Sequence, residues 1–291
     1  TVMVKDINSG ASSAPKYLTV VGSTLYFQAD DGTNGYELWK SDGTASGTVM
    51  VKDINSGSIG SSPDDLTAVG NTLYFRANDG TNGYELWKSD GTASGTVMVK
   101  DIYSGWIGSS PDELTPVGNT LYFQAYDGTN GYELWKSDGT ASGTVMVKDI
   151  NSGNSGSYPY ELTAVGSTLY FRADDGTNGY ELWKSDGTAS GTVMVKDINS
   201  GSSGSNVGFF TEVSNIVYFR ADDGTNGAEL WKSDGTASGT VMVKDINSGS
   251  SDSNPFFLTA IGSTLYFQAI DGTNGPELWT NRWVYTEVTY S

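Results

Sequence analysis

The tripeptide Glu-Leu-Trp recurs at a fixed interval along this chain. A step of 48 residues separates the tryptophans of consecutive copies, which are Trp39, Trp87, Trp135, Trp183, Trp231 and Trp279. This period is longer than that of most helical repeats and matches one blade of a β-propeller. Six copies therefore predict six structural units of one kind, rather than the two unrelated domains that 291 residues would otherwise suggest.

Each unit contains four short segments with the residue types of β-strands. In the second unit they span residues 66–69, 72–77, 84–88 and 96–102. The connections are rich in Gly, Asp and Asn, which favour tight turns between neighbouring strands. We therefore expect each unit to be a four-stranded antiparallel meander, numbered first to fourth strand along the chain.

The second strand carries bulky side chains on both of its faces. Leu73 and Phe75 alternate with Tyr74 and Arg76, so neither face has the polar character of a solvent-exposed surface. Neighbouring blades of a propeller bury both faces of each sheet. We predict an all-β fold, a six-bladed β-propeller of four-stranded antiparallel blades, with the repeated Trp in the packing between blades.

The two ends of the repeat array complement each other. Residues 1–7 copy a fourth strand without the first three, whereas residues 280–282 replace the Lys-Ser-Asp-Gly-Thr that leads to a fourth strand elsewhere. We predict that residues 1–7 complete the last blade and close the ring, which removes exposed strand edges. The propeller then spans residues 1–280. Residues 281–291 form an extra C-terminal strand or an assembly contact, and that strand is also a competitor for the place of residues 1–7.

The unit resembles the bacterial ELWxxDGT repeat, which is grouped with hyalin-like repeats. The sequence that carries the resemblance is Gly-Tyr-Glu-Leu-Trp-Lys-Ser-Asp-Gly-Thr, and the sixth copy lacks its Asp-Gly-Thr after Trp279. The resemblance implies a secreted or cell-surface bacterial protein whose ligands are undefined, and it implies no catalytic residues. The five full copies begin at Glu37, Glu85, Glu133, Glu181 and Glu229.

Composition excludes several classes of function. The formal charge of −18 repels nucleic acids and anionic lipids, so neither is an expected partner. No run approaches the roughly 20 apolar residues that span a bilayer. The chain has no Cys and no His, which excludes thiol catalysis, Cys-ligated zinc and the Ser-His-Asp triad. Because the methionines all occupy one repeat position, we expect a chain that is processed, trimmed or part of something longer.

Glycoside cleavage remains as the one enzymatic alternative, because it needs two carboxylates and neither His nor Cys. A single active site would require acids that the repeat does not duplicate. Glu113, Glu161 and Glu212 meet that condition, but they belong to separate units. An enzyme is therefore the least favoured interpretation, and no cofactor is required.

The segment Asp-Asp-Gly-Thr-Asn-Gly-Tyr-Glu offers the oxygen ligands that calcium prefers. The alternative is that Asp-Gly and Asn-Gly form turns and need no metal, which the lack of an EF-hand spacing favours. Calcium is thus a secondary prediction. Its candidate ligands are Asp31, Asn34, Glu37, Asp79, Asn82, Glu85, Asp127, Asn130, Glu133, Asp175, Asn178, Glu181, Asp223, Asn226, Glu229, Asp271, Asn274 and Glu277.

The six copies differ most between each fourth strand and the next first strand. In a meandering blade these segments emerge on the same face as the Asp-Gly-Thr-Asn-Gly loops, and that face carries many aromatic residues. Exposed aromatics beside carboxylates and amides bind neutral sugars or anchor a protein partner, although drift in unconstrained loops explains the variation equally well. The candidate ligand-binding residues are Tyr17, Trp106, Tyr126, Tyr158, Tyr160, Phe209 and Phe256.

Two functions follow from these patterns. The first is a non-enzymatic, extracellular recognition or adhesion module that binds glycan or protein through the variable face. The second is a structural subunit that self-associates by strand exchange, using residues 1–7 and 283–291. The first is favoured, because it uses the segments in which the copies differ.

Overall fold

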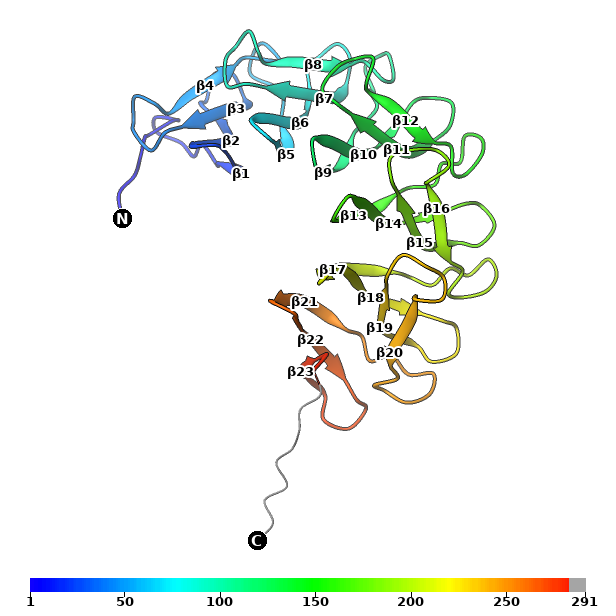
Figure 1. Cartoon of the computed structure of the whole chain (residues 1–291). Coiled ribbons are helices and arrows are strands. Elements are labelled where there is room, and N and C mark those ends of the chain that lie inside the picture. The colour runs from blue at the N-terminus through cyan, green and yellow to red at the C-terminus, as the bar shows by residue number, and fades with distance from the viewer. Residues whose placement is uncertain (283–291) are drawn as a thin grey trace. The chain divides into compact units, whose positions relative to one another are not determined.

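The computed structural model describes residues 1–282, and its regular structure consists of strands alone. The strands form six antiparallel sheets, each a meander in chain order, and the last sheet has three strands among the described residues (Figure 1). The described part contains no helix able to cross a membrane. The strands are β1 (Lys16–Val21), β2 (Thr24–Asp30), β3 (Tyr36–Ser41), β4 (Val49–Lys52), β5 (Asp64–Val69), β6 (Thr72–Asn78), β7 (Tyr84–Ser89), β8 (Val97–Lys100), β9 (Asp112–Val117), β10 (Thr120–Tyr126), β11 (Tyr132–Ser137), β12 (Val145–Lys148), β13 (Tyr160–Val165), β14 (Thr168–Asp174), β15 (Tyr180–Ser185), β16 (Val193–Lys196), β17 (Gly208–Val213), β18 (Ile216–Asp222), β19 (Ala228–Ser233), β20 (Val241–Lys244), β21 (Phe256–Ile261), β22 (Thr264–Ile270) and β23 (Pro276–Thr280).

The chain divides into two compact units, Thr1–Leu162 and Thr163–Ser291. The first unit contains the sheets β1–β4, β5–β8 and β9–β12. The boundary falls within β13, and the second unit contains the remainder of that sheet, the sheet β17–β20 and the sheet β21–β23.

Adjacent sheets within a unit pack face to face through apolar side chains. In the first unit, Tyr26 and Leu38 of one sheet share a cluster with Leu73, Phe75 and Trp87 of the next. Equivalent clusters join the second sheet to the third, and in the second unit the fourth to the fifth and the fifth to the sixth. The prediction that neighbouring sheets cover both faces of a strand is therefore confirmed within each unit. The placement of the repeated Trp in that packing is confirmed for Trp87, Trp135 and Trp231.

The turn between first and second strands follows the predicted chemistry. Gly70 has a φ of 58° at the first central position, which suits a type II′ hairpin. In the fifth sheet, Ser214 and Asn215 both have positive φ, the pattern of a type I′ turn. Each of these tight turns fixes the pairing of the first strand with the second.

Two predicted strands differ from the structure. The fourth strand of the second sheet ends at Lys100 rather than at Ile102, because the amide of Ile102 donates to the Glu85 carboxylate instead of to a strand. Residues 1–7 form no strand, and no sheet of the described residues includes them. The strand predicted for residues 283–291 lies outside the described residues.

Candidate recognition surface

We call the segment between the fourth strand of one sheet and the first strand of the next sheet a linker. A buried glutamate holds each of these linkers in place. Glu85 is completely buried, and its two carboxylate oxygens accept four hydrogen bonds from the linker 101–111. The donors are the amides of Ile102 (3.2 Å) and Tyr103 (3.2 Å) and the amide (2.8 Å) and hydroxyl (2.6 Å) of Ser109. No cation pairs with this carboxylate in the described contacts, so three backbone amides and one hydroxyl compensate its burial.

The same arrangement recurs in the other complete sheets. Each of the five glutamates is fully buried and accepts from the linker that follows it; they are Glu37, Glu85, Glu133, Glu181 and Glu229. Burial raises the pKa of these carboxyl groups, to about 7 for Glu133 and Glu181, although the hydrogen bonds act in the opposite direction. The repeated Glu is therefore a structural anchor for the linkers.

These glutamates make stability dependent on pH. In an unfolded chain a glutamate titrates near pH 4.3, below the folded-state pKa of about 7 for Glu133 and Glu181. Between these two pKa values the folded chain binds more protons than the unfolded chain. The contribution of the two protonated glutamates to the free energy of unfolding is therefore full below about pH 4.3 and is lost as the pH rises through about 7. We expect the thermal midpoint to fall between about pH 5 and pH 8, and the double variant Glu133→Gln, Glu181→Gln to flatten that profile. A midpoint that rises over this interval would contradict the assignment.

Each linker lies against the Asp-Gly-Thr-Asn-Gly loop of its own sheet. The backbones of Gly83 in the loop and Gly108 in the linker touch, since a Cβ placed on Gly83 would clash with the Gly108 amide nitrogen. Gly83 also has a φ of 70°, which favours glycine. The pairs Gly35–Gly60 and Gly131–Gly156 repeat this contact. Linkers and loops are thus held together as one surface of each sheet.

A row of four tyrosines lies on this surface of the first unit. Tyr103 contacts Tyr126 with ring centroids 5.1 Å apart, Tyr126 contacts Tyr132 at 5.5 Å, and Tyr132 contacts Tyr158 at 5.5 Å. Tyr158 is 47% exposed, and Trp106, at the tip of the linker that carries Tyr103, is 82% exposed. We call Tyr103, Tyr126, Tyr132 and Tyr158 the tyrosine row.

Sequence reasoning found part of this row. Tyr126 and Tyr158 were among the predicted ligand-binding residues, and Tyr132 joins them. Tyr103 was missed, although it offers a signal: the other linkers of the described chain carry Asn at this position, as at Asn55 and Asn151. A substitution to an aromatic residue at one copy of a repeated position marks the third linker as distinct.

The remaining predicted aromatics lie elsewhere. Phe209 and Phe256 pack edge to face with ring centroids 4.9 Å apart, and the Arg220 guanidinium lies 5.4 Å from each ring. They form a second aromatic cluster, in the second unit. Tyr17 lies on β1 and is 48% exposed, and Tyr160, which begins β13 two residues after Tyr158 of the tyrosine row, is 41% exposed.

The predicted calcium ligands divide between two separate roles. Asp31 accepts from the amides of Thr33 (2.9 Å) and Asn34 (2.8 Å) and from the Asn34 side chain (2.8 Å). Although burial acts to raise it, these hydrogen bonds hold the pKa of Asp31 below its usual value. Glu37 instead binds the linker. Among residues 1–282 no three His, Cys, Asp or Glu side chains form a group that could hold a metal, and calcium stays a prediction.

Two of the unduplicated acids accept hydrogen bonds from backbone amides. The Glu113 carboxylate accepts the Leu162 amide at 3.1 Å, and the Glu212 carboxylate accepts the Asn215 amide at 2.6 Å. Glu161 precedes Leu162 in β13, and its backbone also hydrogen-bonds the Glu113 carboxylate. Glu113 and Glu212 therefore have structural partners in their own units.

Comparison with solved structures shows a fold likeness at low identity. A prolyl endopeptidase matches 94% of this chain and 40% of its own, with 15% identity and a TM-score of 0.55. Prolyl oligopeptidase B from Galerina marginata matches 92% of this chain and 42% of its own, with 11% identity and a TM-score of 0.54. The β-propeller domain of the trilobed protease from Pyrococcus furiosus matches 91% and 81%, with 11% identity and a TM-score of 0.47.

These likenesses concern the fold. The chain spans about two fifths of the length of the two oligopeptidase-type structures. Together with the packed four-stranded meanders, the two likenesses with TM-scores of 0.55 and 0.54 identify an all-β, propeller-like architecture. No protein-family model matches the chain, and no curated protein matches it.

Proposed function

We propose that this chain is a non-enzymatic recognition or adhesion module that binds glycan or protein through its linkers and Asp-Gly-Thr-Asn-Gly loops. The tyrosine row, with Trp106 beside it in the sequence, is the observation that carries the proposal. Anchored linkers hold these aromatic side chains at a surface, as a binding site on rigid elements requires. An extracellular or cell-surface location in a bacterium is proposed from the resemblance of the repeat.

The chemistry of the surface supports a neutral or weakly polar ligand. Aromatic faces stack on the apolar faces of sugars or anchor the side chains of a partner protein. The net charge of −18 disfavours phosphorylated or sulfated ligands. Tandem sheets with different linkers offer several such surfaces on one chain.

The test is binding to an array of neutral glycans, followed by substitution. Because Trp106 is 82% exposed, we expect Trp106→Ala to leave the thermal midpoint unchanged and to weaken binding by about fivefold or more, which corresponds to about 1 kcal/mol. Ile59→Ala is the matched control, since Ile59 is 81% exposed in the preceding linker, and it should leave affinity unchanged. Equal affinity of Trp106→Ala and the original chain for every bound glycan or protein would contradict the proposal.

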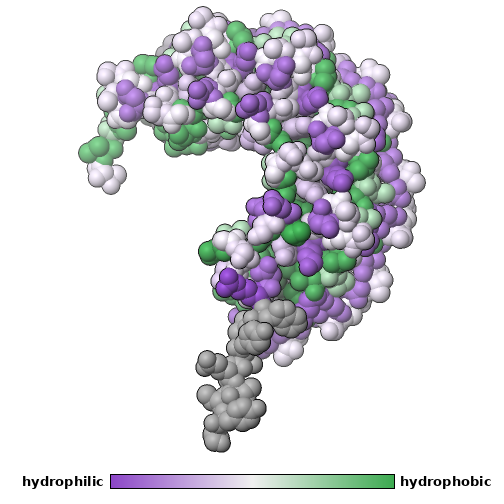
Figure 2. Space-filling model, in the orientation of Figure 1, coloured by the Kyte–Doolittle hydropathy of each residue, from purple (hydrophilic) through white to green (hydrophobic). Residues whose placement is uncertain are grey.

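We further propose that the six sheets form one closed propeller in which residues 1–7 complete the last blade. Two features support closure. Val2 and Met3 are 87% and 78% exposed, at an N-terminal end where apolar side chains gather (Figure 2). In the last sheet, β23 pairs with β22 and with no second strand among the described residues.

A structural subunit that assembles by strand exchange is the second candidate. The same exposed edges favour it, because an unpaired strand edge is a template for pairing with another chain. Phe257 and Ile261 of the last sheet are 78% and 66% exposed. Native mass measurement separates the candidates: higher-order particles without glycan or protein binding would favour assembly.

A further inference from the structure

Glu277 is the sixth copy of the linker-anchoring glutamate, and it is the exposed one. Its five counterparts are completely buried under the linkers that follow them. We infer that residues 1–18 of the same chain dock on the last sheet, with Glu277 accepting from the amides of Ile7, Asn8 and Ser13 and from the Ser13 hydroxyl. This inference rests on the closed propeller proposed above and assigns the contacts that hold it.

Residues 1–13 already lie on the first sheet as a linker lies on the sheet that follows it. The Lys5 ammonium donates to the Thr48 carbonyl at 2.7 Å and lies 6.0 Å from the Trp39 ring centre. In the linker after the first sheet, Lys52 donates to the Thr96 carbonyl at 2.9 Å. Its ammonium lies 5.7 Å from the ring of Trp87. The N-terminal segment therefore copies the position of a linker from its lysine onward.

The match continues to Ser13. The Ser13 carbonyl accepts the Asp30 amide at 3.0 Å, as the Ser61 carbonyl accepts the Asn78 amide at 3.0 Å. Ser61 is the residue whose amide and hydroxyl donate to Glu37. Ser13 thus occupies the position of a glutamate donor. No described glutamate accepts from it.

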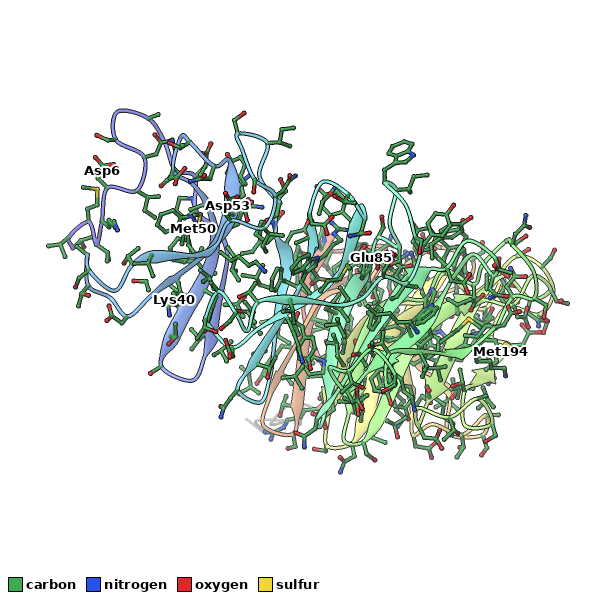
Figure 3. All side chains as sticks on the ribbon, turned by 90° about the horizontal axis from the view of Figure 1, so that it is seen from above. Asp6, Lys40, Met50, Asp53, Glu85 and Met194 are labelled. Atoms are coloured by element: carbon green, nitrogen blue, oxygen red, sulfur yellow. The ribbon has the colours of Figure 1, made fainter. Side chains whose placement is uncertain are left out.

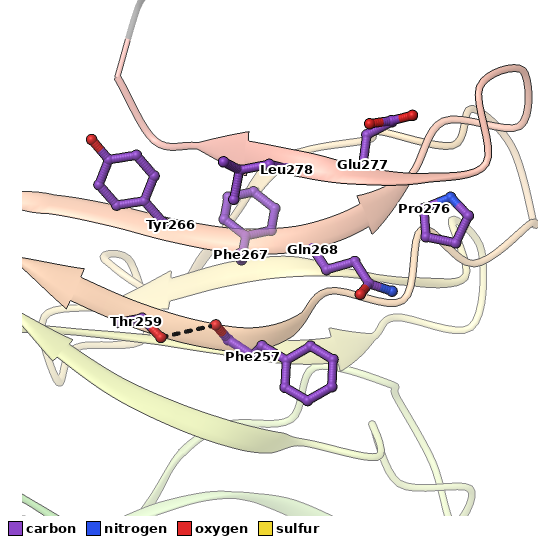
Figure 4. Close-up of a pocket in the computed structure, with 8 residues that line it drawn as sticks. All are labelled: Phe257, Thr259, Tyr266, Phe267, Gln268, Pro276, Glu277 and Leu278. Carbon is purple, nitrogen blue, oxygen red and sulfur yellow. Dashed lines mark hydrogen bonds between the residues drawn. The ribbon is translucent and has the colours of Figure 1, made fainter.

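The last sheet has further groups placed for this contact. Thr19 donates across to the Leu66 carbonyl of the next sheet at 3.0 Å, and Gln28 donates to the Pro63 carbonyl at 2.9 Å. Their counterparts in the last sheet are Thr259 and Gln268, which line an open pocket of about 380 Å³ together with Glu277 (Figure 4).

In that pocket, the Thr259 hydroxyl donates to the carbonyl of Phe257 in the same strand at 3.1 Å, and this is its one described hydrogen bond. By repeat position, the missing acceptors are the carbonyls of Leu18 and Pro15. Leu18 is 63% exposed, whereas its counterpart Leu66 is 9% exposed under the preceding sheet. The last sheet and residues 1–18 are therefore both exposed, and their polar and apolar positions correspond to those that contact each other between complete sheets.

The edge of β23 defines the register. A hollow of about 740 Å³ lies beside this strand, lined by Val243, Lys244, Trp279 and Thr280 among others. Val243 is 37% exposed, whereas its counterpart Val99 is 7% exposed. In complete sheets the fourth strand occupies this place.

The first sheet provides the template for that register. There Trp39 pairs with Met50 and Lys40 pairs with Val49. The same register places Met3 opposite Trp279 and Val2 opposite Thr280. We favour the same chain as occupant, because a covalently linked segment has an effective concentration that a second copy reaches only in concentrated solution.

The register is tested by a cross-link in the full chain, which has no native cysteine. Opposed residues of antiparallel strands lie within disulfide range, so Val2→Cys, Thr280→Cys should form an intramolecular disulfide in most molecules. Lys40→Cys, Val49→Cys is the positive control, and Val2→Cys, Ile59→Cys is the negative control. A disulfide-linked dimer, or cross-linking no greater than in the negative control, would overturn the inference.

The glutamate contact is tested separately. If Ser13 donates to Glu277, Ser13→Ala and Glu277→Ala each lower the thermal midpoint by a few degrees, and the double variant loses less than the sum. Glu212→Ala combined with Ser13→Ala is the control and should be additive. If the disulfide forms but the effects of Ser13→Ala and Glu277→Ala are additive, closure is supported and the glutamate contact is overturned. Failure of both experiments would overturn both.

Discussion

Replacing Glu85 by alanine is expected to lower the free energy of unfolding by about 3 kcal/mol or more. The change removes the acceptor of four hydrogen bonds from the linker 101–111. Each buried donor left without a partner costs about 1–3 kcal/mol, although water entering the cavity recovers part of this. Glu85 lies among the side chains of the first unit (Figure 3). Denaturant unfolding followed by tryptophan fluorescence measures the loss.

Glu85→Gln is the matched control for that variant. The amide has nearly the same volume and keeps one oxygen acceptor, so the loss should be smaller than for alanine. Because the linker carries Tyr103 and Trp106, Glu85→Ala should also make residues 101–111 the first site of proteolytic cleavage. An unchanged unfolding curve for Glu85→Ala would show that the carboxylate does not anchor the linker.

The repeated sheet could be predicted from sequence because its signal is local and is repeated six times. The step between tryptophans gave the size of the unit, and alternation such as that of Leu73 with Tyr74 indicated a sheet covered on both faces. Such a pattern depends on the period of a strand, which is a property of neighbouring residues. The burial of Trp87 and Phe75 in one cluster follows from it.

The role of the repeated glutamate could not be predicted in the same way. Glu37 accepts from Ile54, Asn55 and Ser61, which follow it across a third-to-fourth-strand turn, a fourth strand and part of a linker. No spacing rule connects a carboxylate with donors that distant, whereas the nearby Asp31 and Asn34 suggested oxygen ligands for a metal. Long-range hydrogen bonds therefore give Glu37 a different role from Asp31 and Asn34, although all three residues were predicted as ligands of one metal.

The aromatic surface could be predicted from sequence only in part. Its residues could be selected because they vary among copies, but contacts between them depend on how one linker folds toward the next loop. Tyr103 and Tyr126 are separated by two strands and a turn, yet their rings lie 5.1 Å apart. Variation identified candidate positions, and three-dimensional packing determined which of them form a row.

Phe123→Ala is expected to lower the free energy of unfolding by about 3–5 kcal/mol, the range for large aromatic truncations in a core. Phe123 is fully buried in the cluster between the second and third sheets, where it packs with Leu86 and Trp135. Loss of the ring leaves a cavity that two β-sheets cannot readily close, because their hydrogen-bonded backbones resist collapse. The midpoint of urea unfolding gives the magnitude.

Phe27→Ala provides the comparison that makes this prediction informative. Phe27 has the same repeat position in the first sheet, but its described cluster is small, with Ala29 and Trp39 as its fully packed neighbours. In the closed propeller proposed above, another sheet covers Phe27, so Phe27→Ala should cost about as much as Phe123→Ala. A clearly smaller cost would contradict closure, because a first sheet without a covering sheet loses fewer contacts. A Phe123→Ala variant as stable as the original chain would contradict the face-to-face packing itself.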